Sequence, residues 1–348
     1  ERSLFRAIFA VEYLYSVQWP CAIVIVGTLQ GVGSNQDSSI FRTSFCIHAG
    51  ALFSVIFTSA LLHYFHWRIV VIQASGLSMA AAAIGSFFVR DSLKKTNDPP
   101  NPVMPALWEE FESRKQSNPS ITGSLGSFIH FILSATVTGV WPEIVALLRS
   151  GTFWILSLAH VGDAVVRSSE RVLAAYFQDT SSTVSDNLAT RLSLLLSVGM
   201  ILGLSTVGTE FTRSNAKERN RILSKLYSIA VVSCYGLAIL AIPHLRHWMG
   251  DALVFQAALT IAMGFGVSVP SYVPGIVGAS YGRRKGLFAA YADGVACGLA
   301  SLTWSIVGRT VEGGNGGEWA LGWAIVALLV LLSGVVMWVF VEHHAVWG

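Results

Sequence analysis

Residues 319–341 read WALGWAIVALLVLLSGVVMWVFV, an apolar run without a single charged side chain. A helix of about 20 residues crosses the roughly 30 Å hydrocarbon core of a bilayer, whereas the apolar runs of soluble strands reach only about 4 to 8 residues. Similar runs recur along the chain, and 53% of its 348 residues are hydrophobic while only 12% are charged. Soluble domains have roughly a quarter of charged residues. The sequence therefore predicts an all-α integral membrane protein.

We expect nine membrane-spanning helices, each long enough to cross the hydrocarbon core. They cover residues 5–29, 42–62, 68–89, 152–177, 188–208, 222–243, 252–279, 286–308 and 319–341. The longest and most polar connection joins the third span to the fourth. It separates a partial N-terminal bundle, 1–90, from a C-terminal six-helix bundle, 151–348. We expect 91–150 to be the inter-bundle loop, in which the short apolar stretch 128–141 lies at the membrane interface.

Lys and Arg residues are distributed unevenly among the predicted connections. Most of them lie in the long loop and in two short basic loops, 209–225 and 283–285. Basic residues of membrane proteins concentrate on the cytoplasmic side. We therefore expect a multi-pass protein in which these three loops are cytoplasmic.

The charge and cysteine patterns argue against several functional classes. The net charge of +3 is scattered and forms no basic face, so nucleic acid is not an expected partner. The cysteines lie within apolar runs and none belongs to a CxxC pair, which argues against a disulfide framework and against zinc. There is no phosphate-binding P-loop, so a nucleotide-driven pump is not expected. We expect neither a metal nor a cofactor.

The predicted helix 152–177, TFWILSLAHVGDAVVRSSERVLAAYF, carries ionisable residues where a membrane helix should be apolar. Within an arc of roughly 100° it places five of them: His160, Asp163, Arg167, Glu170 and Arg171. A central Asp or Arg costs about 2.5 to 3.5 kcal/mol on insertion scales, so this face should contact protein or water. Asp163 with Arg167, and Arg167 with Glu170, are spaced to neutralise one another in part. The face either lines a solute pathway or locks two helices through an ion ladder.

The nature of the solute follows from arginine chemistry. The planar guanidinium of Arg167 can donate two parallel hydrogen bonds to a carboxylate or a phosphate. A solute pathway along this face therefore predicts a small anionic substrate.

Two further polar residues in predicted spans are candidates for the same site. His48 could act as a second anion donor or as a proton-linked group, or it could be a core histidine. Asp293 could contact substrate or couple transport, or it could make an interhelical hydrogen bond. Glu12 and Gln18 in the first span are expected to have packing roles.

Glycines are abundant, and some are spaced four apart within spans, as Gly199 is with Gly203 and Gly294 with Gly298. Small residues at this spacing let helices approach closely in lipid. We expect these pairs to pack helices rather than to bind a solute.

Several motifs together resemble the major facilitator superfamily, and specifically its organophosphate:phosphate antiporter branch, the glycerol-3-phosphate and sugar-phosphate transporters. The best match is LRSGTFWILSLAHVGDAVVR at 148–167, which is similar to the seventh family helix and places Arg167 on the substrate-phosphate arginine. CIH at 46–48 resembles the Cys-x-His element and places His48 on another substrate position. The remaining matches are Trp19-Pro20, Arg90-Asp91 with Pro99-Pro100, Glu210 and Arg213 in GTEFTRSNAKERNR, Pro270 with the RRKG turn, and YADG at 291–294.

The resemblance implies a fold in which the nine predicted helices correspond to family helices four to twelve. Since the chain begins at Glu1 without an initiator Met or a signal peptide, we expect a segment upstream with the first three helices. The resemblance also implies that two bundles rock about a midplane site where Arg167 binds the anion and His48 assists. The chain departs from the family pattern at Ala164, where the family has an aromatic residue, and in three additional charges, Asp163, Glu170 and Arg171.

The predicted function is a secondary active transporter of a small anionic solute by alternating access, with exchange of an organophosphate for phosphate as the family version. The substrate-binding candidates are Arg167, His48, Asp163, Arg171 and His160. The coupling or gating candidates are Glu170, Asp293, Glu210 and Arg213, of which the last two resemble a motif that locks helices between conformations. We expect a monomer in the bilayer.

Three alternatives stay open. One is a proton-coupled carrier of carboxylates or sugars in which Asp163 and Asp293 titrate. Another is a membrane receptor or scaffold that does not transport. A membrane enzyme that uses His160 with Asp163 as an acid-base pair is disfavoured, because no nucleophile or metal partner accompanies the pair.

Overall fold

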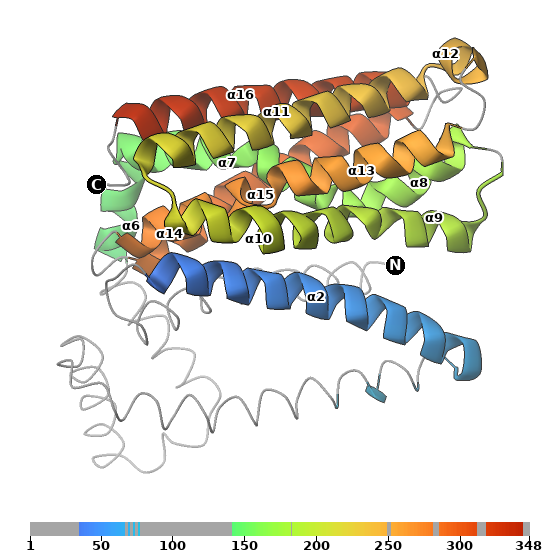
Figure 1. Ribbon diagram of the computed structural model, residues 1–348, viewed down its shortest axis with the longest axis horizontal. Coiled ribbons are helices and arrows are strands. Elements are labelled where there is room, and N and C mark those ends of the chain that lie inside the picture. Colours follow the sequence, from blue (N-terminus) through green and yellow to red (C-terminus); the bar gives the residue numbers. More distant parts are fainter. Residues whose placement is uncertain are drawn as a thin grey trace. The chain divides into compact units, whose positions relative to one another are not determined.

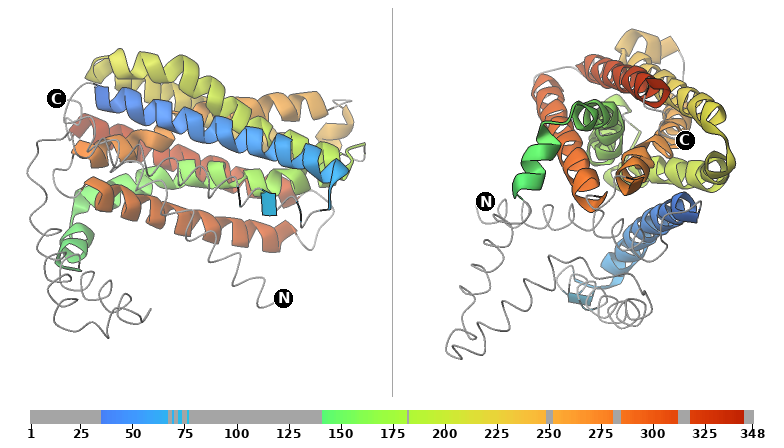
Figure 2. Two further views of the ribbon diagram at one scale, coloured as in Figure 1. Left: turned by 90° about the horizontal axis from the view of Figure 1, so that it is seen from below. Right: turned by 90° about the vertical axis from the view of Figure 1, so that its left-hand side faces the viewer.

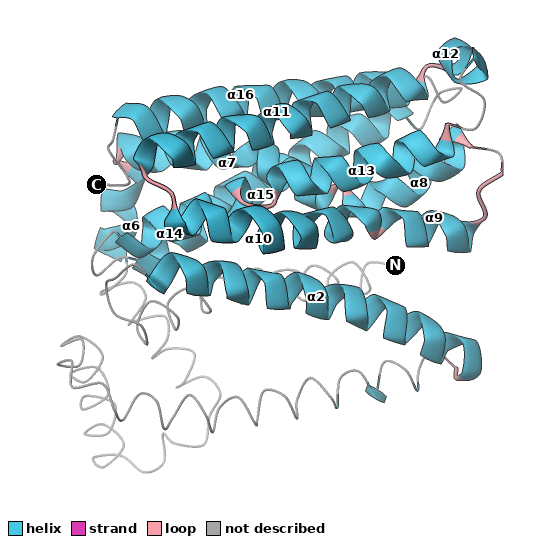
Figure 3. Cartoon of the chain, in the orientation of Figure 1, coloured by secondary structure: helices cyan, strands magenta, loops and turns pink. Residues whose placement is uncertain are grey.

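The computed structural model describes residues 35–66, 69, 72, 73, 76, 141–181, 183–248, 252–280, 285–311 and 318–343. Every regular element in this part of the chain is a helix (Figure 3). The predicted span 5–29, most of 68–89 and nearly all of the interfacial stretch 128–141 lie outside the described residues. So do Glu12, Gln18, Trp19, Pro20, Arg90, Asp91, Pro99, Pro100 and the two arginines of the RRKG turn.

The chain divides into two compact units, residues 1–70 with 152–348 and residues 71–151. In the second unit the structure describes the short helix α6 (Trp141–Leu148). The other helices of Figure 1 form the first unit. They are α2 (Asn35–Tyr64), α7 (Gly151–Ser168), α8 (Glu170–Thr180), α9 (Asp186–Ser193), α10 (Leu195–Arg213), α11 (Ala216–Ala241), α12 (Pro243–Trp248), α13 (Leu253–Val267), the 3₁₀ turn η3 (Pro270–Tyr272), α14 (Val273–Ser280), α15 (Lys285–Val311) and α16 (Glu318–His343).

Among the described residues, four helical segments are long and apolar enough to cross a membrane, namely Asp186–Arg213, Ala216–Ala241, Leu253–Val277 and Glu318–Glu342. They correspond to four of the predicted spans, so the chain is a membrane-embedded helical protein. Helices α2, α7 with α8, and α15 cover the predicted spans 42–62, 152–177 and 286–308.

Helix α11 packs between α13 and α16, and α10 packs against α13 (Figure 2). The glycines of α10 allow the second contact. A Cβ on Gly199 would overlap the backbone oxygen of Ile261, and a Cβ on Gly203 would overlap the hydroxyl of Ser268. The predicted close approach at Gly199 and Gly203 is therefore confirmed. For Gly294 and Gly298 the prediction is wrong within the part of the chain that the structure describes, where neither position has an atom within 4 Å of a built Cβ.

The outer face of α16 shows why a bilayer suits this bundle. Between residues 321 and 339 its exposed side chains are apolar and lie on one side of the helix: Leu321, Leu328, Leu331, Leu332, Val335, Trp338 and Val339. A soluble protein rarely exposes such a continuous apolar face, whereas acyl chains would cover it without loss.

Helix α2 is the described helix of the predicted N-terminal bundle, and it packs against α10 and α14 (Figure 1). Phe41 near its start is buried and meets the rings of Phe211 and Tyr272 edge-on, with ring centroids 5.9 and 6.4 Å apart. This aromatic contact places the first half of α2 beside α10 and η3.

Candidate functional site

The predicted helix 152–177 is two helices, α7 and α8, with a turn at Ser169. The Ser169 amide donates to the oxygen of Val166 (3.0 Å), three residues back, and its hydroxyl donates to the same oxygen (2.7 Å). Such back-bonding by serine tightens and bends a helix. Trp304 of α15 supports the bend, since its indole N–H donates to the Val165 oxygen and to the Ser168 hydroxyl, both at 3.0 Å. Arg167 thus lies in the last turn of α7, next to the break.

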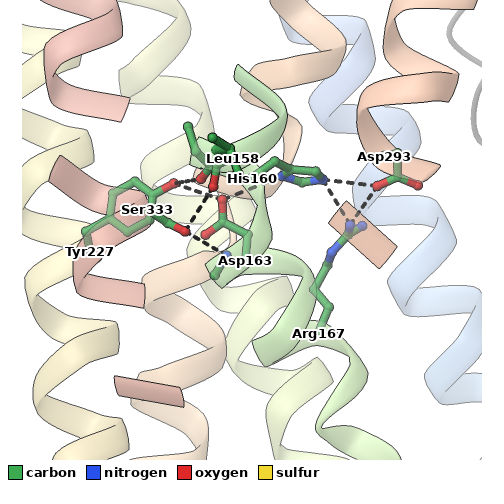
Figure 4. Close-up of polar contacts among 9 residues, drawn as sticks. Leu158, His160, Asp163, Arg167, Tyr227, Asp293 and Ser333 are labelled. Atoms are coloured by element: carbon green, nitrogen blue, oxygen red, sulfur yellow. Dashed lines mark hydrogen bonds and ion pairs between the residues drawn. The ribbon is translucent and has the colours of Figure 1, made fainter. Parts of the chain in front are cut away.

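Arg167, His160 and Asp293 form a tight triangle between α7 and α15 (Figure 4). Arg167 Nη2 donates to Asp293 Oδ1 at 2.8 Å. His160 Nε2 lies 3.0 Å from the same carboxylate oxygen and 3.1 Å from Arg167 Nη2. Three groups that the sequence predicted as site residues, two on α7 and one 126 residues away from Arg167, therefore meet.

The triangle has one open side. The side chains of Arg167 and Asp293 are 23% and 15% exposed, whereas that of His160 is 1% exposed. Arg167 contacts His160 and Asp293 through Nη2, and its Nε is buried without a hydrogen-bond partner within the described chain. The guanidinium therefore keeps an unused donor beside its partly exposed end, and an anion needs such donors for a bidentate contact.

Asp163 lies on the closed side of His160. Its carboxylate is fully buried, and its Oδ2 accepts a hydrogen bond of 2.9 Å from the Tyr227 hydroxyl of α11. The Tyr227 hydroxyl also lies 3.2 Å from the Ala159 oxygen. Asp163 thus faces the interface of α7 with α11. The ion pair expected between Asp163 and Arg167 is not formed within the described chain, and Arg167 pairs with Asp293 instead.

Helix α16 closes this side. The Ser333 hydroxyl accepts from the Gly162 amide at 2.8 Å and donates to the Leu158 oxygen at 3.3 Å (Figure 4). A Cβ at position 162 would collide with Val330 and Ser333. Gly162 therefore lets α16 reach the backbone of α7, and Asp163 is sealed from the solvent.

Besides Arg167 Nε, two buried atoms of this cluster lack hydrogen-bond partners within the described chain, His160 Nδ1 and Asp163 Oδ1. His160 Nδ1 lies 3.7 Å from Asp163 Oδ2, which is close enough for charge attraction but too long for a hydrogen bond. The imidazole thus lies between two carboxylates, one at each ring nitrogen.

His48 reaches the same region from α2. Its Nε2 lies 2.6 Å from the Tyr272 hydroxyl of η3, and its ring is edge-on to that of Tyr272. Both His48 and Tyr272 lie within the electrostatic range of Arg167. The structure therefore brings His48 into the region of Arg167 through a tyrosine that sequence reasoning missed, and a role of His48 in solute binding stays a prediction. No pattern around Pro270-Ser271-Tyr272 marks it.

The other candidates lie apart from the triangle. Glu170 begins α8 and accepts a hydrogen bond of 3.3 Å from Ser197 of α10, while Arg171 is exposed. Glu210 and Arg213 are exposed in the last turn of α10. No ion pair joins Glu210 to Arg213 among the residues that the structure describes, so a lock between them stays a prediction.

Comparison with known proteins found no matching family model, and no curated protein matches the sequence significantly. Within the described ranges no group of three His, Cys, Asp or Glu residues could hold a metal ion. Chemistry at this site is therefore inferred from the charged triangle and its surroundings.

Proposed function

We propose that this chain is a secondary active transporter of a small anionic solute, related to the organophosphate:phosphate antiporters of the major facilitator superfamily. Arg167 is the anion-binding group, and His160 and His48 line the same region. The nine predicted spans, with the long loop and the two basic loops on the cytoplasmic side, belong to this proposal. Phosphate and phosphate esters are the solutes to test first, because the resemblance aligns Arg167 with a substrate-phosphate arginine.

The observation that carries the proposal is how Arg167 is paired and how far its side chain is exposed. A charged group in a membrane protein is expected to face a polar route or a partner rather than lipid. Arg167 has a carboxylate partner on one nitrogen, a buried Nε without a hydrogen-bond partner within the described chain, and a partly exposed side chain. A purely structural ion pair would be expected to use both parallel N–H groups of the guanidinium.

The ion pair also suggests how binding could drive a conformational change. Asp293 holds Arg167 at 2.8 Å and so joins α15 to α7. An anion that takes over the guanidinium weakens this joint. Since a ligand shifts an equilibrium by its differential affinity for two states, an anion would favour the state in which α7 and α15 are separated.

Exchange of radiolabelled phosphate by the full-length protein in liposomes tests the proposal. Arg167→Lys keeps the charge but loses the planar fork, so we expect at least about a tenfold loss of exchange. Arg309→Lys is the matched control, because Arg309 is exposed at the end of α15. It should exchange like the wild type.

The same assay separates the alternatives. Exchange by Arg167→Lys at the wild-type rate would remove Arg167 from the site and contradict the proposal. Phosphate binding without any flux would indicate a receptor.

A further inference from the structure

His160 is placed to carry a proton between two acidic groups. Its Nε2 lies 3.0 Å from Asp293 Oδ1 on the open side, and its Nδ1 lies 3.7 Å from Asp163 Oδ2 on the sealed side (Figure 4). An imidazole that bridges two carboxylates from opposite ring nitrogens can hold one proton or two.

The protonation of Nε2 decides which neighbour it bonds. Arginine only donates and an ionised carboxylate only accepts. A protonated Nε2 therefore donates to Asp293, whereas an unprotonated Nε2 accepts from Arg167 Nη2 at 3.1 Å. The partner of Asp293 can thus pass from Arg167 to His160 without movement of the carboxylate.

The ionisable groups that face His160 come from three helices. Asp163 and Arg167 lie on α7 with it, Asp293 lies on α15, and Tyr227 of α11 bonds Asp163. From α16 the neighbour is the uncharged Ser333. Beyond Arg167 lie His48 of α2 and Tyr272 of η3.

Charge balance fixes how many protons this set holds without a solute. Arg167 and Asp293 neutralise each other. Asp163 and a neutral His160 together carry one negative charge, so the His160–Asp163 pair is neutral once it holds one added proton. An uncompensated charge among groups as buried as His160 and Asp163 costs several kcal/mol. The solute-free site therefore favours one added proton.

A monovalent anion on Arg167 changes this balance. It adds one negative charge and draws the guanidinium away from Asp293. Neutrality returns if the pair takes up a second proton, with His160 as an imidazolium that donates to Asp293 and Asp163 as a neutral acid. The two partnerless atoms, His160 Nδ1 and Asp163 Oδ1, are positioned to hold the added protons.

We propose that anion binding at Arg167 takes up one proton from water onto the His160–Asp163 pair, so that the solute and the proton occupy the protein together. This inference rests on the proposed function, because it needs an anion at Arg167. It goes further than that function in assigning proton coupling to His160. The partner of the Asp293 carboxylate then changes from the Arg167 guanidinium to the His160 imidazolium.

Calorimetric titration of the purified full-length protein with inorganic phosphate tests this coupling. Titrations in two buffers of different ionisation enthalpy give the number of protons taken up per phosphate bound. Protons that phosphate itself takes up or releases on binding are the same in the wild type and in the variants. They therefore cancel when the proton counts of two proteins are subtracted. We expect the wild type to take up about one proton more than His160→Gln or His160→Asn, and the variants to bind phosphate about tenfold more weakly.

Each outcome decides a different point. Equal proton counts in the wild type and in a variant that binds would overturn the coupling and leave the transporter proposal standing. Loss of phosphate binding in both variants would make His160 an anion ligand and would also overturn it. No phosphate binding by the wild type would remove the proposed function itself.

Discussion

Arg167 of α7 and Asp293 of α15 are joined by one hydrogen-bonded ion pair of 2.8 Å, and both side chains keep some exposure. Two helices are thus held at this point by a charge contact that another anion can replace. A fully buried pair would be inaccessible to a solute, and a fully exposed one would contribute little to either stability or binding. The partial exposure is what makes competition between Asp293 and a solute possible.

Asp293→Asn tests this competition. In the wild type an incoming anion has to displace the Asp293 carboxylate from Arg167, whereas an amide does not compete for the charge. We expect phosphate to bind about tenfold more tightly to the variant, as measured by calorimetric titration. Asp179→Asn is the control. Asp179 lies at the end of α8, and its carboxylate accepts a hydrogen bond from the indole N–H of Trp319 in α16. Weaker binding in Asp293→Asn would show that Asp293 supports the solute rather than competes with it.

Tyr227→Phe tests the sealed side of the cluster. The hydroxyl of Tyr227 is the hydrogen-bond donor that Asp163 has at 2.9 Å, and both side chains are buried. Its removal leaves a buried carboxylate oxygen unsatisfied, so we expect a loss of about 1 to 3 kcal/mol in stability. Thermal unfolding in detergent should show a lower midpoint. Tyr235→Phe alters an exposed tyrosine two turns further along the same helix and should unfold like the wild type. Equal midpoints for the two variants would contradict the role of Tyr227.

The sequence could predict which residues of one helix share a face, but not which residue of another helix meets them. Periodicity placed His160 and Arg167 together, and both lie in the triangle. The partner of Arg167 was expected four residues away at Asp163. Pairs at this spacing contribute only about 0.2 to 0.5 kcal/mol on a helix surface. A distant carboxylate brought close by packing, Asp293, therefore replaces the local partner.

Local sequence signals account for the helix break at Ser169 but not for the contact of His48 with Tyr272. The break at Ser169 follows from two adjacent serines that bond back to the helix, which a search for such pairs could have found. The contact of His48 with Tyr272 joins residues 224 positions apart. Only the packing of α2 against the C-terminal helices creates it, so no pattern within either segment could predict it.

Gly199→Ala tests the close contact of α10 with α13. A methyl group at this position would overlap the backbone oxygen of Ile261, which cannot move away as a flexible side chain could. The helices have to separate, so we expect a loss of about 1 to 3 kcal/mol and a lower unfolding midpoint. Gly308→Ala is the matched control, since no atom lies within 4 Å of a Cβ built there. Its midpoint should stay the same or rise slightly, because alanine favours the helix over glycine. A stable Gly199→Ala would mean that α10 and α13 do not pack this closely.

Labelling of Cys297 tests whether the Arg167 region is open to water. Cys297 is exposed, lies one helical turn after Asp293 and is within the electrostatic range of Arg167, whereas Cys234 is buried. With Cys21 and Cys46 replaced by serine, a charged thiol reagent should modify Cys297 and spare Cys234. A nearby guanidinium attracts anions. We therefore expect an anionic reagent to react several-fold faster than a cationic one, and phosphate to slow it. Modification by lipophilic reagents alone, with no effect of phosphate, would place this face of α15 against acyl chains. An aqueous route to Arg167 would then have no support from its nearest cysteine.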